Sequence, residues 1–151
     1  MILKLRQRMA QDESGFTLVE LLVVMLILGL LAAIAIPAFF NQRDKAKDAS
    51  AKEAVRTAET AMETYATDHD GKYNNPTPTA ANLRAIESTL NDATLADPTG
   101  VTASGYKVTV TSSTGNTFSI TRNSDGTTDL TCTAAGTAGC PGSGGGTGNW
   151  G

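Results

Sequence analysis

The chain has 151 residues, a formal net charge of −3 and an aromatic content of only 5%. This length leaves room for one small domain together with a membrane segment. The acidic balance argues against a surface that binds nucleic acid, which is normally basic. Because aromatic side chains are too few for a large core, much of the stability must come from assembly or from a cysteine pair.

An uncharged run of twenty residues, Leu21 to Phe40, follows the segment Gly-Phe-Thr-Leu-Val-Glu. As a helix it would be about 30 Å long, which matches the hydrocarbon thickness of a bilayer. Glu20 stands at the edge of this run, where an uncompensated carboxylate is costly. An ordinary secretory signal cleaved after Ala33-Ile34-Ala35 and a plain membrane anchor are alternatives. Neither explains Gly15-Phe16 or Glu20.

The motif Gly-Phe-Thr-Leu-x-Glu after a short basic leader resembles the N-termini of type IV pilin and pseudopilin precursors. The resemblance implies that residues 1–15 are a leader peptide and that a membrane-embedded prepilin peptidase cuts between Gly15 and Phe16. It also implies methylation of the new Phe16 amine. A glycine before the cut allows close approach to the backbone, which supports this site. The N-terminus is expected on the cytoplasmic side of the cytoplasmic membrane, with the chain in lipid until assembly.

Cleavage would create an α-amino cation four residues before Glu20. The Phe16 amine is then the natural partner of this carboxylate, on the same chain or on a neighbouring subunit. Such a pair would fix the axial register between helices, as buried polar residues do in coiled coils. By the same resemblance, an assembly ATPase and an inner-membrane platform protein extract the subunit into a self-associating filament at the cell surface or across the periplasm.

A helical pattern runs from Phe16 to about Asp68. Its first part, residues 16–40, is apolar all round, as expected of a transmembrane and assembly helix. Its second part, residues 41–70, is amphipathic, and pairs such as Asp48 with Lys52 are expected on the exposed face. The apolar stripe that should pack on the following domain consists of Ala51, Val55, Ala58, Met62 and Tyr65.

Pro37 interrupts the apolar helix, and Gly29, eight residues earlier, adds backbone freedom. A proline inside a helix removes one backbone hydrogen bond and is expected to kink the isolated chain. The resemblance implies more, namely that the segment between Gly29 and Pro37 loses helicity in an assembled filament. A kink without any role in assembly is the alternative.

Residues 71–132 are predicted to form a globular α/β head. Gly71 should end the long helix as a left-handed cap, and Thr79 should cap a short helix that reaches about Leu90. Three segments with alternating apolar residues follow, at 106–111, 117–121 and 128–132, separated by turn residues. The predicted fold is α+β, a pilin-like lollipop whose long helix packs on a small three-stranded antiparallel sheet.

The last segment, residues 133–151, is rich in glycine and is expected to be flexible, with Trp150 as an incidental aromatic. Cys132 and Cys140 are the only cysteines, and in an exported chain they suggest a disulfide that closes the start of this tail. Two free thiols are the alternative. Zinc would need more ligands, and the single histidine, His69, is distant in sequence and expected to be solvated.

No catalytic constellation or cofactor motif is visible, so we expect a structural protein and no enzyme. Asp125 and Asp129 are candidates for calcium ligands, and the alternative is that their segment forms an ordinary hairpin turn. The expected function is that of a structural subunit of a type IV pilus-like helical filament. The alternative is a pseudopilin of a type II secretion or DNA-uptake system. A membrane-bound enzyme and a nucleic-acid-binding tip module are less favoured rivals.

Overall fold

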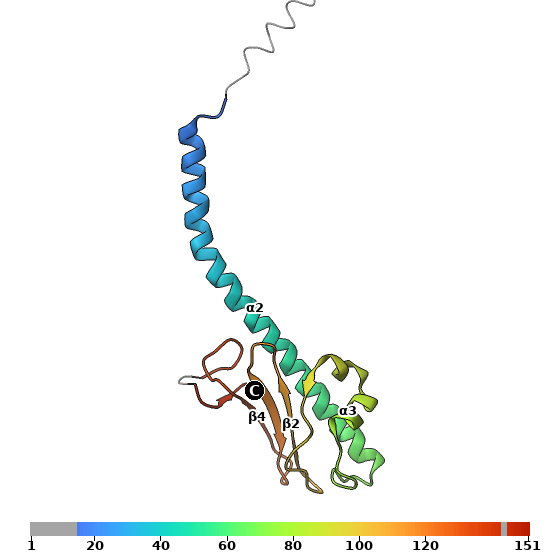
Figure 1. Ribbon diagram of the computed structural model, residues 1–151. Coiled ribbons are helices and arrows are strands. Elements are labelled where there is room, and N and C mark those ends of the chain that lie inside the picture. The colour runs from blue at the N-terminus through green and yellow to red at the C-terminus, as the bar shows by residue number, and fades with distance from the viewer. Residues whose placement is uncertain (1–14, 143–144) are drawn as a thin grey trace, which may run out of the picture. The chain divides into compact units, whose positions relative to one another are not determined.

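The computed structural model describes residues 15–142 and 145–151. Its elements in chain order are the helix α2 (Leu18–Asp68), the helix α3 (Ala80–Ile86), the 3-10 helix η1 (Ser88–Asp92) and the strands β1 (Thr94–Leu95), β2 (Tyr106–Thr111), β3 (Thr117–Arg122), β4 (Thr128–Cys132) and β5 (Gly148–Asn149) (Figure 1). The chain divides into two compact units, with the boundary after Phe39, inside α2. The predicted α+β class is confirmed.

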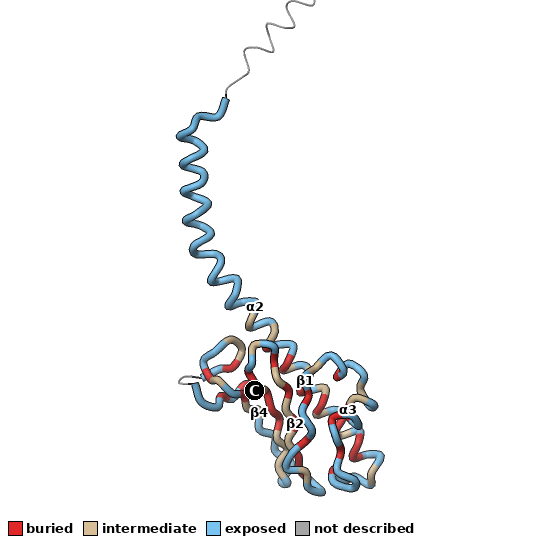
Figure 2. The backbone as a smooth tube through the Cα atoms, in the orientation of Figure 1, coloured by how far each residue is buried: buried red, intermediate tan, exposed pale blue. Residues whose placement is uncertain are grey.

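The described part of the first unit is the apolar half of α2. The helix runs without interruption from Leu18 to Asp68, with Pro37 inside it. Every residue from Phe16 to Phe40 is exposed, as the pale blue part of the tube shows (Figure 2). Among the described helices, α2 is the one that is long and apolar enough, by length and composition, to cross a membrane. Loss of helicity near Pro37 inside a filament stays a prediction.

The second half of α2 supplies one wall of the core of the second unit. All five residues of the predicted stripe are buried, and Val55, Ala58 and Met62 have no exposed surface. Ala51, Val55, Ala58 and Met62 belong to the same apolar cluster as side chains of α3, η1 and the sheet, namely Leu83, Leu90, Val108, Val110, Phe118 and Ile120. Burial of this stripe fixes which face of the helix is covered by the sheet.

The end of α2 and the start of α3 follow the sequence signals. Gly71 has a φ of 74°, and its N–H donates to the carbonyl of Ala66 at 2.8 Å, as a left-handed cap requires. Thr79 caps α3 in a reciprocal capping box with Asn82. The predicted continuation of this helix to Leu90 is wrong, because Glu87 is extended and its carboxylate caps η1 instead.

Over the residues that the structure describes, the sheet has five antiparallel strands in the consecutive order β1-β2-β3-β4-β5, where three were predicted. The three predicted strands form its centre, with Val108 opposite Ile120 and Ile120 opposite Leu130. The two additional strands are edge strands of two residues each, β1 against β2 and β5 against β4. Two residues cannot display an alternation of period two, so the sequence pattern could not reveal these strands.

The glycine-rich tail is folded onto the sheet over its described residues, so the prediction of a flexible tail with an incidental tryptophan is wrong. Trp150 is only 9% exposed, and its ring meets that of Phe118 edge to face, with centroids 6.0 Å apart. Its indole N–H donates to the carbonyl of Thr131 at 2.9 Å. Burial of one large aromatic group, with its polar atom satisfied, offsets part of the entropic cost of ordering the glycines.

Candidate functional site

The predicted processing site lies just before α2. Gly15, Phe16 and Thr17 are exposed and non-helical. A Cβ added at Gly15 would meet no described atom within 4 Å. Within the described chain, the Gly15–Phe16 peptide bond is therefore open to an enzyme that must approach the backbone. Cleavage at this bond and methylation of Phe16 remain predictions.

Thr17 and Glu20 form a reciprocal capping box at the start of α2. The backbone N–H and the hydroxyl of Thr17 each donate to Glu20 Oε2 at 2.8 Å, and the N–H of Glu20 donates to Thr17 Oγ1 at 3.2 Å. These contacts satisfy N–H groups at the helix N-terminus, so α2 begins at Leu18 instead of Phe16. Sequence reasoning missed this role of Thr17, although Thr-x-x-Glu is the signature of the motif.

The capping box occupies one oxygen of Glu20. Among the hydrogen bonds between described residues, Oε2 accepts both donors from Thr17 and Oε1 accepts none. Glu20 can therefore bind a cation through Oε1 without releasing the helix cap. The pairing of Glu20 with the Phe16 amine stays a prediction, because that amine exists only in a cleaved chain.

Asp48 is a buried structural residue that was predicted to be exposed. The predicted exposed pair of Asp48 with Lys52 does not form, because Asp48 is fully buried and Lys52 Nζ lies 5.6 Å from the centre of the Trp150 ring. Asp48 Oδ2 accepts from Asn116 Nδ2 at 2.7 Å and from the N–H of Gly139 at 2.8 Å. Asp48 Oδ1 accepts from the hydroxyl of Thr114.

These donors keep the Asp48 carboxylate charged in its buried position. Burial would raise its pKa, but hydrogen bonds from Ser112, Thr114, Gly139 and Asn116 outweigh burial and lower the pKa below the ordinary value. Without such donors, a buried charge would cost too much free energy to remain ionised. Asp48 thus joins α2 to the turn between β2 and β3 and to the segment that carries Cys140.

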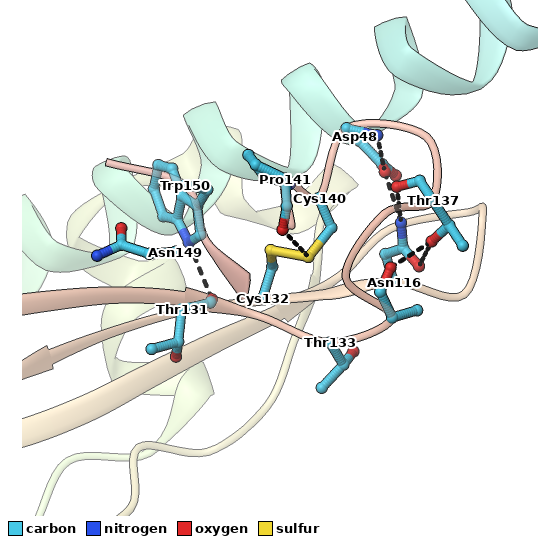
Figure 3. Close-up of a disulfide and its surroundings, with 12 residues drawn as sticks. Asp48, Asn116, Thr131, Cys132, Thr133, Thr137, Cys140, Pro141, Asn149 and Trp150 are labelled. Carbon is cyan, nitrogen blue, oxygen red and sulfur yellow. Dashed lines mark hydrogen bonds between the residues drawn. A yellow bond between two sulfur atoms is a disulfide. The ribbon is translucent and has the colours of Figure 1, made fainter. Parts of the chain in front are cut away.

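The predicted disulfide between Cys132 and Cys140 is confirmed, with the two Cα atoms 5.8 Å apart. Both cysteines are buried. The bridge joins the end of β4 to the tail (Figure 3). It closes a short loop, residues 132–140, which we call the disulfide loop. Gly139 of this loop lies against Asp48, since a Cβ added there would be 2.6 Å from Asp48 Cβ.

A second carboxylate, Glu63, connects α2 to the opposite end of the sheet. It accepts from the hydroxyl of Tyr73 at 2.8 Å and from that of Tyr106 at 2.9 Å. Arg122 Nη1 lies 3.4 Å from the same carboxylate. Glu63 and Asp48 therefore hold the two ends of the sheet to one helix, and neither contact was predicted.

The calcium candidates are engaged in the turn between β3 and β4. Asp125 Oδ1 accepts from the N–H of Thr127 at 2.9 Å and from its hydroxyl, while Asp129 Oδ2 accepts from Asn123 Nδ2 at 2.9 Å. Both aspartates are exposed. No group of three or more His, Cys, Asp or Glu side chains that could hold a metal occurs among the described residues. These contacts are those of a hairpin turn.

His69 is half-buried at the end of α2, where we expected a solvated side chain. Its ring stacks on that of Tyr65 with centroids 3.9 Å apart, and its Nδ1 lies 2.7 Å from the carbonyl oxygen of Tyr65. Nothing in this arrangement resembles a catalytic pair.

Comparisons with known proteins agree with the N-terminal motif. Residues 11–36 match the family described as the prokaryotic N-terminal methylation motif. The chain is 39% identical over 59 residues to type II secretion system core protein G of Pseudomonas aeruginosa, a match that covers 39% of this chain and 42% of that protein. It is 41% identical over 58 residues to the type IV major pilin protein PilA of Myxococcus xanthus, covering 38% and 26% of the two chains.

These two matches span less than half the length of each relative. A longer match is that to type II secretion system core protein G of Vibrio cholerae, 31% identical over 143 residues and covering 93% of both chains. No solved structure matches the chain. The apolar helix and these relatives indicate a membrane-anchored protein. The chain belongs to the family of type IV pilins and type II secretion pseudopilins.

Proposed function

We propose that this chain is the precursor of a non-enzymatic structural subunit of a type IV pilus-like helical filament. Residues 1–15 are the leader, residues 16–40 the transmembrane and assembly helix, and residues 41–70 the part of the helix that carries the head. The head comprises residues 71–132 together with the folded tail, residues 133–151. Prepilin peptidase cuts at Gly15–Phe16 and methylates Phe16, and no cofactor is needed for the subunit's own role.

The observation that carries the proposal is the exposure of the apolar half of α2. Leu18, Leu26 and Ile34 are 70% exposed or more, and residues 21–40 carry no charge. So large an apolar surface cannot remain in water. A bilayer covers it before assembly, and the same segments of neighbouring subunits cover it in a filament. Self-association therefore replaces lipid contacts with protein contacts along one helix.

The proposed partners follow from the transfer of the subunit from the bilayer to the filament. The N-terminus faces the cytoplasm in the cytoplasmic membrane, and an assembly ATPase with its inner-membrane platform protein transfers the subunit from lipid to the filament. Glu20 and the Phe16 amine of a neighbour set the register, and Gly29 and Pro37 allow the helix to loosen as subunits pack. Nucleic acid is not an expected partner, because the net charge is −3.

Mass spectrometry of the membrane-inserted chain tests the processing step. The wild-type protein should begin at Phe16 and carry one extra methyl group on its amine. Gly15→Phe should leave the chain at precursor length, because the added side chain blocks the approach to the scissile bond. Gly29→Val, a bulky substitution in the same helix far from the cut, is the matched control and should be cleaved normally. A mature chain that begins at Ile36 would show ordinary secretion and overturn the proposal.

A pseudopilin of a secretion or DNA-uptake system is the second candidate. The observation that favours it is the match to the Vibrio cholerae secretion protein, which extends over the head as well as the helix. Deletion of the gene separates the two functions. Loss of sheared surface filaments that contain this subunit supports the pilus. Normal filaments with a loss of protein secretion or of DNA uptake support the pseudopilin.

A further inference from the structure

The Asp48 carboxylate receives hydrogen bonds from two segments that are far apart in sequence. Thr114 and Asn116 belong to the turn between β2 and β3, whereas Gly139 belongs to the disulfide loop, 91 positions after Asp48. Figure 3 shows Asp48 and Asn116 next to this loop, with the disulfide on its other side. One fully buried charge therefore depends on donors from both segments.

The disulfide loop holds Gly139 in place together with several hydrogen bonds of its own residues. Within the loop, the N–H of Cys140 donates to the carbonyl of Thr137 at 2.9 Å, and the N–H of Gly136 donates to the carbonyl of Cys140 at 2.9 Å. Between the loop and the turn, Asn116 Nδ2 donates to the carbonyl of Thr137 at 3.3 Å, and the hydroxyl of Thr137 donates to Asn116 Oδ1 at 3.3 Å. The N–H groups of Thr133 and Ala135 donate to the carbonyls of Thr117 and Gly146. Gly139 directly precedes the bridged Cys140. The covalent bond is thus one residue away from the N–H group that faces Asp48.

We propose that the Cys132–Cys140 disulfide and Asp48 form a redox-dependent latch that orders the turn between β2 and β3 together with the disulfide loop. With the bridge closed, Gly139 is held where its N–H meets the carboxylate. With two thiols, this loop of small residues gains conformational freedom. Asp48 then loses a donor while still buried, and the turn that supplies its other donors loosens with it.

The redox step is a thiol–disulfide exchange. An oxidant that carries a disulfide accepts two electrons and two protons from the Cys132 and Cys140 thiols, and the new S–S bond closes the loop. A dithiol reductant reverses the step and itself becomes a disulfide. The latch therefore closes in an oxidising compartment and stays open in a reducing one. This inference concerns the folded head and does not depend on which filament the subunit builds.

A double-mutant cycle on the full mature chain in detergent micelles tests the coupling. Asp48→Asn removes an acceptor from a site where every partner is a donor. We expect Asp48→Asn to increase the equilibrium constant for unfolding of the head. The factor of increase should be at least about tenfold larger in the disulfide-bonded chain than in the Cys132→Ser, Cys140→Ser variant. Asp92→Asn, at an exposed site, is the matched control and should have the same small effect in both backgrounds. Equal effects of Asp48→Asn in both backgrounds would overturn the latch.

Amide hydrogen exchange gives a second readout that needs no substitution. Addition of a dithiol to the wild-type chain should accelerate exchange at residues 112–116, which contain no cysteine and lie outside the disulfide loop. Gly139→Ala should have the same effect with the disulfide intact, because its Cβ would be 2.6 Å from that of Asp48. Faster exchange confined to the disulfide loop, with no change at residues 112–116, would show that the bridge acts only locally and would refute the proposal.

Discussion

The hydroxyl of Tyr106 donates to Glu63 Oε1 at 2.9 Å and ties the start of β2 to α2 across 43 positions of sequence. Tyr73 donates to the other oxygen of the same carboxylate. Burial and the neighbouring Glu63 both disfavour a phenolate, so the pKa of Tyr73 is raised to about 12 and that of Tyr106 is raised as well. This end of the head is therefore sensitive to alkali.

The first prediction concerns that alkaline sensitivity. Because the folded state raises both tyrosine pKa values, their contribution to stability is complete below pH about 10, the ordinary pKa of tyrosine. It is lost as the pH rises through the folded-state values, about 12 for Tyr73. Urea unfolding, followed by Trp150 fluorescence, should show that the free energy of unfolding declines over this alkaline range. Tyr106→Phe should lower the free energy of unfolding by about 1.5–3 kcal/mol at neutral pH, because a hydrogen bond to a charged group is lost. The free energy of unfolding of this variant should also fall less steeply as the pH rises.

Tyr65→Phe is the control for this measurement. The hydroxyl of Tyr65 donates to the carbonyl of Pro76 at 3.0 Å, a neutral acceptor outside the Glu63 cluster. Its removal should cost about 1 kcal/mol and leave the alkaline decline as steep as in the wild type. An alkaline decline that persists unchanged in Tyr106→Phe would remove Tyr106 from the explanation.

The second prediction concerns acid. The pKa of Asp48 is lowered in the folded chain, so its contribution is fully present above the unfolded pKa of about 3.9 and is lost as the pH falls below that value. Asp48→Asn should cost about 1–3 kcal/mol at neutral pH, because donors are left unpaired. The difference in free energy of unfolding between the wild type and Asp48→Asn should become smaller as the pH falls. Asp92→Asn, at an exposed site, is the control. If the difference in free energy of unfolding between the wild type and Asp48→Asn stays constant until the protein unfolds in acid, the lowered pKa of Asp48 would be contradicted.

The third prediction separates the two roles of Glu20. Glu20→Val should give a chain that is made, inserted and cleaved but yields few filaments, since the Phe16 amine of a neighbour is left unpaired in an apolar environment. Co-expressed wild-type subunit should rescue some incorporation. The measurement is a count of sheared filaments at equal subunit levels.

Thr17→Ala and Val19→Ala provide the controls for Glu20. Thr17→Ala weakens the helix start by about 1 kcal/mol but keeps the carboxylate, so it should assemble better than Glu20→Val. Val19→Ala should assemble as the wild type does. Abundant filaments built only from Glu20→Val subunits would show that the residue is a helix cap and nothing more.

The fourth prediction concerns Trp150. Its ring is buried beside Phe118 and lies beneath Arg56, whose guanidinium is 5.3 Å from the ring centre. Trp150→Ala should destabilise the head by about 3 kcal/mol or more and increase exchange of the amides of β4. Since the fluorescent residue is removed, denaturant unfolding of this variant is followed by near-ultraviolet absorbance of the tyrosines. Asn149→Ala, at an exposed neighbour, is the control, and an equal loss in both variants would mean that the indole itself contributes little.

The long helix and its C-terminal cap were predictable because their signals are local, whereas the cap formed by Thr17 at its start was missed. The spacing of Ala51, Val55 and Met62 identified the buried face of α2, and Gly71 and Thr79 marked a cap at either side of the next loop. Asp48 was not predictable in this way. Its position, three residues before Ala51, continues the spacing of the buried stripe, but a charged side chain is not expected to be buried there. Only the donors brought by the β2–β3 turn and the tail make its burial possible. The same holds for Trp150, whose pocket exists only once the sheet has formed.

The consecutive order of the five strands has a kinetic consequence. Each strand pairs with its neighbour in the chain, and the three central strands β2, β3 and β4 form a meander joined by two turns of five residues each, so their pairing is local in sequence. The few ties across long stretches of sequence, from Glu63 to Tyr106 and from Asp48 to Gly139, join the sheet to α2. We therefore expect the meander to form early and its docking onto the helix to be the slow, rate-limiting event.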